Sequence, residues 1–290
     1  MAALRALLLS IWLGLWLTVP AWATPCGGVP TSSVASDLSA LMSSADKAKP
    51  TGAVKPGGGE VKPGGGEIKP GGGEATIKTK PSAKGTSKSF RDLTQGATPK
   101  AADAPKTLTL PTKLSQGLQK SWDGSLPKGK AQEQGGILVV DGKGNLTWRQ
   151  GPPGTEGWFA TNYSDAKPGE TILADVHTHP YSKKEGGFTG VSFSGGDYGA
   201  MLYQEHRLSL VQSGNVVYAV ATTAEWEKKT SGLNAKEREK LYNEIQATWD
   251  ANFDGSDFVN DAEKAAKATA TKYGLVLYRG VNGGTLKRIN

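Results

Sequence analysis

The sequence predicts a mixed α/β domain, with a mostly antiparallel sheet flanked by helices, preceded by a long disordered tail. Three observations lead to this prediction. Short apolar runs separated by turn residues recur in the second half of the chain, two long helical patterns interrupt them, and the part before them is dominated by Gly, Pro and Lys. A chain of 290 residues has room for one ordinary domain with extensions, or for two small domains.

The first 23 residues have the layout of a secretory signal peptide. Arg5 precedes an apolar run over residues 6–17, which Pro20 and the A-x-A pattern of residues 21–23 follow. A membrane anchor is the alternative interpretation, but the run is shorter than the roughly 20 residues that span a bilayer. We therefore expect cleavage after this segment, a secreted or periplasmic protein, and no membrane span in the mature chain.

Residues 24–124 are predicted to be a disordered linker. The heptapeptide [VI]KPGGGE occurs three times in succession, over residues 54–60, 61–67 and 68–74. A seven-residue period is also typical of a coiled coil, but each glycine costs about 1 kcal/mol in a helix relative to alanine. The repeats therefore favour a solvated linker. The single cysteine, Cys26, lies in this tail and cannot form an internal disulfide.

The net charge of +7 belongs to the tail. Residues 24–130 contain 16 Lys and Arg against 8 Asp and Glu, whereas residues 131–290 contain 17 against 19. A basic tail makes weak contacts with polyanions or an anionic cell surface. The balanced charge of the remaining chain gives no indication of specific nucleic-acid binding.

The folded domain is expected over residues 125–290, a length that supports a proper core. Apolar runs of strand length, with Asp141-Gly142 and Ser213-Gly214 as turn signals, predict two hairpins and three further strands. The expected strands cover residues 136–140, 145–148, 171–179, 207–212, 215–221, 275–278 and 285–289.

Helices are expected between these strands. One is predicted over residues 197–206, and a helical insertion covers residues 231–273. The insertion begins with a capping box at Asn234, carries an apolar stripe at i, i+4 and i+8, and continues with a second helix over residues 258–273.

Two of the three histidines lie one residue apart, in His177-Thr178-His179-Pro180. Because side chains alternate along a strand, both imidazoles project from one face, which suits joint binding of one ion. Asp197, in Ser194-Gly195-Gly196-Asp197, is the nearest carboxylate with a return path to them. Two imidazoles, a carboxylate and one open position describe a catalytic zinc site, so the sequence predicts Zn²⁺ bound by these three side chains.

Each motif also has a simpler interpretation. The histidine pair is compatible with surface or structural residues, and S-G-G-D is an ordinary capping box with Ser194 as N-cap. A serine nucleophile is disfavoured, because residues 190–194 lack the final glycine of a G-x-S-x-G elbow.

Together, H-x-H-P followed by S-x-x-D resembles the signature of the JAMM (JAB/MPN) zinc metallopeptidases, in particular the bacterial branch of exported and toxin-associated proteins. That family also has an upstream glutamate in an E-x-x-G-[ILM] context, which Glu133-Gln134-Gly135-Gly136-Ile137 matches. The matching pieces extend from Glu133 to about Thr223. The resemblance implies a JAB/MPN-like, cytidine-deaminase-like fold over the domain.

The resemblance also implies a mechanism of amide hydrolysis. His177, His179 and Asp197 would hold Zn²⁺, which lowers the pKa of its water from about 15.7 towards about 7. Glu133 would accept the proton and pass it to the leaving amine. Ser194 would donate a hydrogen bond to the oxyanion, a contribution of about 3 kcal/mol.

Two features depart from the family pattern. The loop over residues 181–193 is longer than usual, which favours a flap over the metal and makes Ser192 the alternative to Ser194. The helical insertion is not part of the pattern. Two further signals have simple interpretations: residues 250–261 resemble a calcium loop but fit an acidic turn with a helix N-cap better, and His206 is expected at a helix C-terminus.

The function predicted is therefore an exported zinc metallopeptidase that acts on a peptide or isopeptide bond of a peptide or protein substrate, and that serves as a secreted effector or toxin. Two alternatives from other classes stay open. One is a JAMM-like module that binds without catalysis, and the other is an envelope or adhesion protein that acts through its basic tail.

Overall fold

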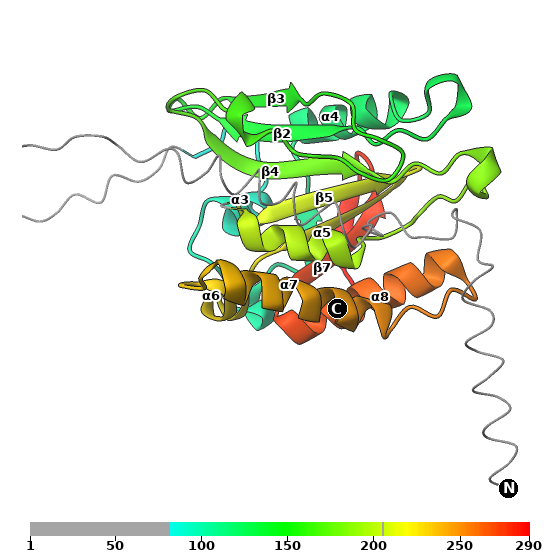
Figure 1. The fold of residues 1–290 in the computed structure, drawn as a ribbon. Coiled ribbons are helices and arrows are strands. Elements are labelled where there is room, and N and C mark those ends of the chain that lie inside the picture. The colour runs from blue at the N-terminus through cyan, green and yellow to red at the C-terminus, as the bar shows by residue number, and fades with distance from the viewer. Residues whose placement is uncertain (1–81, 205) are drawn as a thin grey trace, which may run out of the picture. The chain divides into compact units, whose positions relative to one another are not determined.

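In a computed structural model, the protein is described over residues 82–204 and 206–290. The signal peptide, Cys26 and the three repeats predicted above lie outside these residues. The described strands form one eight-stranded sheet in the order β1-β8-β7-β6-β5-β4-β2-β3 (Figure 1). The strands are β1 Thr107–Thr109, β2 Gly135–Val140, β3 Leu146–Gln150, β4 Thr171–Thr178, β5 Leu208–Ser213, β6 Val216–Ala221, β7 Val276–Val281 and β8 Thr285–Arg288.

The sheet is mixed and mostly antiparallel, as predicted. Every pair of neighbouring strands is antiparallel except β4 and β5, which run parallel. The predicted turns have the expected chemistry. Asp141 accepts hydrogen bonds from the backbone N–H groups of Lys143 and Asn145 in the β2–β3 turn, and Gly214 has a φ of 69° in the β5–β6 turn.

Helices cover both faces of the sheet. Helices α3 (Lys88–Thr94) and α4 (Thr112–Asp123) share one buried core cluster with every second residue of β5, β6 and β7. Helices α5 (Gly195–Ala200), α6 (Ala224–Thr230), α7 (Ala235–Asp250) and α8 (Phe258–Tyr273) share a second cluster with the alternate residues of β5 and β6. The period-two alternation of the strands thus separates two cores. No helix in residues 82–204 and 206–290 is both long and apolar enough to cross a membrane.

The prediction that the linker extends to residue 124 is wrong from residue 82 onward. Leu114 and Leu118 of α4 are fully buried, as are Phe90 and Leu93 of α3. Strand β1 pairs with β8 at one edge of the sheet. Burying one such side chain contributes about 1.5–3 kcal/mol, so this segment is part of the domain although its composition is rich in Lys, Thr, Ser and Pro.

The helical insertion is present with the predicted start. Asn234 and Glu237 form the capping box of α7, and Asp257 caps α8 by accepting from the backbone N–H of Asn260. The acidic turn is therefore a helix N-cap, as the simpler interpretation held. The helix expected over residues 197–206 is shorter: α5 ends at Ala200, and one 3₁₀ turn, Met201–Tyr203, follows it.

Candidate metal centre

His177 and His179 lie at the end of β4, and both face the side of the sheet that α5 covers. His177 is the penultimate residue of the strand, and His179 follows its last residue. Their Nε2 atoms are 3.0 Å apart. The neighbours Ala174 and Val176 belong to the opposite core cluster, so the alternation of β4 places both imidazoles on the same face, as predicted.

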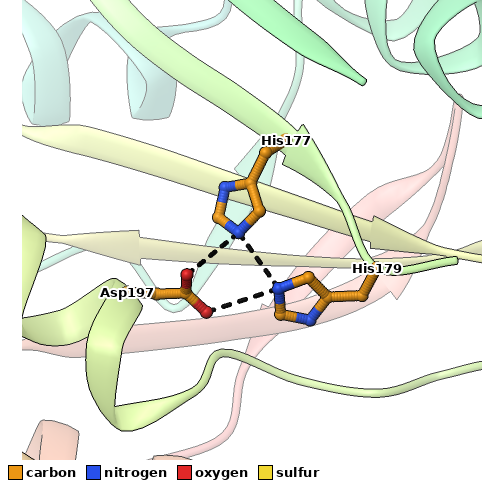
Figure 2. Close-up of side chains that lie close together, drawn as sticks. All are labelled: His177, His179 and Asp197. Carbon is orange, nitrogen blue, oxygen red and sulfur yellow. Dashed lines mark hydrogen bonds and ion pairs between the residues drawn. The ribbon is translucent and has the colours of Figure 1, made fainter. Parts of the chain in front are cut away.

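Asp197 approaches the two imidazoles from the first turn of α5. Its Oδ1 lies 3.2 Å from Nε2 of His177, and its Oδ2 lies 3.4 Å from Nε2 of His179 (Figure 2). One ligand atom from each of the three residues lies within 4.8 Å of the others. Within the described part of the chain, this is the one such group of three His, Cys, Asp or Glu side chains.

The geometry of these three donors fits a bound metal ion. Ligands at 2.0–2.2 Å from a tetrahedral ion lie about 3.3 Å from each other. The two imidazole nitrogens are separated by nearly this distance, and each of them lies at a similar distance from a different carboxylate oxygen of Asp197. Nδ1 of His179 lies 3.1 Å from the backbone carbonyl oxygen of Ser192. Donation from Nδ1–H to that carbonyl leaves the lone pair of Nε2 directed at the centre, as a metal ligand requires.

The charges of the three donors stabilise one another. Burial alone would raise the pKa of Asp197, but the imidazoles of His177 and His179 outweigh it and hold that pKa well below its ordinary value. Burial alone would lower the pKa of His177, but Asp197 outweighs it and raises that pKa. The carboxylate is therefore ionised between two imidazoles, an arrangement that either a proton or a bound cation would stabilise.

Ser194 holds Asp197 in place. Its backbone N–H and its hydroxyl both donate to Oδ2 of Asp197, at 2.7 and 2.8 Å. Its Oγ accepts in turn from the backbone N–H of Asp197 at 3.2 Å. This is the capping box that the simpler interpretation predicted, and it fixes the orientation of the Asp197 carboxylate.

Glu133 lies beside the end of β4 but is not one of the three clustered donors. It precedes Gly135, the residue of β2 that pairs with His177, by two positions. The residue is 3 % exposed, and its backbone N–H donates to the carbonyl of Thr155 at 2.7 Å. Glu133 is therefore a buried acidic residue whose backbone lies next to the strand end that carries the histidines.

Glycines bring the surrounding segments close to the centre. A Cβ at Gly199 would lie 2.3 Å from the ring of Tyr242, and one at Gly195 would lie 2.8 Å from the side chain of Gln246. Both glycines are on α5 and both neighbours are on α7, which lies next to α5 in front of the sheet (Figure 1). The helical insertion thus packs directly on the helix that carries Asp197.

The loop over residues 181–193 is packed on the insertion. Phe188 contacts Tyr181 and Phe258, with ring centroids 5.8 and 4.9 Å apart. The backbone N–H of Gly190 donates to the carbonyl of Ser213 at 2.9 Å. These contacts anchor the loop to the insertion and to β5. Its opening as a flap stays a prediction.

Sequence reasoning missed a buried pair next to the centre. Asp175 lies two residues before His177 on the same face of β4, and its Oδ1 is 2.8 Å from Nε2 of His206. Both side chains are buried. The expected position of His206 at a helix C-terminus is wrong, because the 3₁₀ turn ends at Tyr203. Burial would raise the pKa of Asp175, but His206 holds it below its ordinary value.

We expect replacement of His206 by phenylalanine to destabilise the fold by about 3–5 kcal/mol, because it leaves the Asp175 carboxylate buried without its main partner. His206→Gln is the matched control, since its amide can still donate to Asp175. Urea unfolding of both variants measures the difference. Equal stability of His206→Phe and the wild type would show that the pair has no structural role.

Comparisons with known proteins identify no relative of this chain. No family model, no curated protein and no solved structure matches this chain. What the chain does is therefore inferred from the residues that converge at the end of β4.

Proposed function

We propose that the protein is a metal-dependent hydrolase of peptide or isopeptide bonds, with zinc as its metal and a JAMM-like centre. The observation that carries the proposal is the convergence of His177, His179 and Asp197, which bring one ligand atom each to within 4.8 Å of the others. Three protein ligands leave one coordination position for water, which is the pattern of catalytic rather than structural zinc. The proposal includes export of the protein, because its first 23 residues have the layout of a signal peptide.

Each residue of the chain has a separate task in this proposal. The zinc ion, when bound, supplies Lewis acidity and makes water nucleophilic near neutral pH. Asp197 and the two imidazoles hold the ion, and Ser194 keeps the carboxylate oriented. Glu133 accepts a proton from the attacking water and delivers it to the leaving nitrogen. Its burial and the place of its backbone beside the end of β4 support this role.

The proposal is tested with the purified full chain by elemental analysis and peptide hydrolysis. We expect about one zinc per chain. Removal of the metal by a chelator should lower the cleavage of fluorescently labelled casein and of a mixed peptide pool to background, and added Zn²⁺ should restore it. Bound zinc without hydrolysis of any peptide would favour the alternative of a binding module. A chain that retains no metal would overturn the proposed hydrolase.

A further inference from the structure

The hydroxyl of Ser194 already donates a hydrogen bond to Asp197, one of the proposed metal ligands. A serine hydroxyl has one proton to donate, and that of Ser194 lies on Oδ2 of Asp197 at 2.8 Å. Its oxygen also accepts the backbone N–H of Asp197. Donation to a substrate oxygen would require Ser194 to release Asp197 at the moment when the centre must hold the metal. Another donor is therefore needed for the oxyanion of the proposed reaction.

The hydroxyl of Ser192 differs from that of Ser194 because it makes no hydrogen bond among the described residues. The residue is 1 % exposed, and its Oγ has no hydrogen-bond partner within residues 82–204 and 206–290. Buried polar groups are nearly always paired, and an exception calls for an explanation. Its backbone carbonyl accepts from Nδ1 of His179, so the residue lies directly against a metal ligand.

The burial of Ser192 is compatible with a role at the proposed metal centre. His179 is equally buried, at 1 % exposed, and its Nε2 still faces the other donors. Ser194 has extended backbone angles, with φ −83° and ψ 170°, and residues 191–194 contain no helix or turn. Ser192 precedes Ser194 by two residues in this segment, and the two serines contact different members of the centre, His179 and Asp197. The ring of Phe193 between them packs edge-on against His177, with centroids 6.3 Å apart.

We propose that Ser192, and not Ser194, donates the hydrogen bond that stabilises the oxyanion, while Ser194 positions Asp197. The inference rests on the proposed hydrolase function and assigns the two serines of that site. An unpaired donor in a site shielded from water is suited to this task, because it need not break another hydrogen bond when negative charge develops. A buried hydroxyl without a hydrogen-bond partner lowers the free energy of unfolding.

The test measures metal binding, anion binding and stability in the zinc-loaded full chain. The probe is methylphosphonate, a tetrahedral oxyanion, titrated by calorimetry. Ser192→Ala should keep the zinc content, keep or raise the urea midpoint, and weaken methylphosphonate binding about tenfold or more. Ser194→Ala should weaken zinc binding and lower the urea midpoint, and Ser194→Thr should restore both.

Thr269→Val is the matched control. Thr269 of α8 is also fully buried, and its hydroxyl has no hydrogen-bond partner among the described residues, but it lies outside the centre. Its loss should affect stability as Ser192→Ala does and leave methylphosphonate binding unchanged. A lower urea midpoint for Ser192→Ala, or unchanged anion affinity, would overturn the inference. Failure of the wild type to bind zinc would instead overturn the proposed function, so the two failures are distinguishable.

Discussion

Replacement of His177 by alanine is expected to abolish metal binding and hydrolysis together. The variant keeps only two of the three donors, His179 and Asp197. Loss of a partner outside the ligand shell already costs about 10–100-fold in metal affinity, and loss of a ligand costs more. Zinc content after dialysis should therefore fall from about one per chain to background, and peptide cleavage should fall with it.

The fold should survive this change. In the wild type, the Nε2 atoms of His177 and His179 lie 3.0 Å apart, a separation that needs a proton or a cation between them. Alanine removes that requirement, and His177 is not part of either apolar core cluster. Circular dichroism in the presence of a chelator should thus give a spectrum close to that of the wild type. The urea midpoint should fall, because Asp197 loses one of its two imidazole partners.

His206→Gln is the control for this experiment. It removes the third histidine of the chain, whose Nε2 is bonded to Asp175 and not directed at the centre. This variant should keep one zinc per chain. Equal zinc content in His177→Ala and the wild type would show that the metal binds elsewhere, and the proposed centre would be wrong.

Local sequence signals predicted the elements that depend on local chemistry. The strands follow from apolar runs, the hairpins from Asp141-Gly142 and Ser213-Gly214, and the start of α7 from the Asn234 capping box. The convergence of His177, His179 and Asp197 was also predicted. The period of a strand puts the two imidazoles on one face, but the choice of Asp197 depended on its return path along the chain and on the JAMM resemblance.

Features that depend on distant contacts were not predictable. The segment over residues 82–124 resembles a linker in composition, and its place in the domain depends on the pairing of β1 with β8, more than 170 residues away. The Asp175–His206 pair joins residues 31 apart with no periodic pattern between them. The one signal that was available is the position of Asp175, two residues before His177 on the same strand face.

Replacement of Glu133 by glutamine is expected to separate metal binding from catalysis. Glutamine has nearly the shape of glutamate but cannot accept a proton from water. Because positioned general acid–base groups contribute about 10²–10⁴-fold to rate, kcat should fall by a factor of that order. Zinc content should stay at the wild-type level, since Glu133 is not one of the three clustered donors. Glu133→Ala should give the same separation.

A neighbouring carboxylate provides the control for Glu133. Glu156 is exposed and follows Thr155, whose carbonyl accepts the backbone N–H of Glu133. Glu156→Gln thus removes a charge from the adjacent segment without changing the buried acid, and it should keep both zinc and full activity. Loss of zinc in Glu133→Gln would identify Glu133 as a ligand. Full activity in that variant would place the general base elsewhere, because no neutral amide can perform the proton transfer that the cleavage of an amide bond requires.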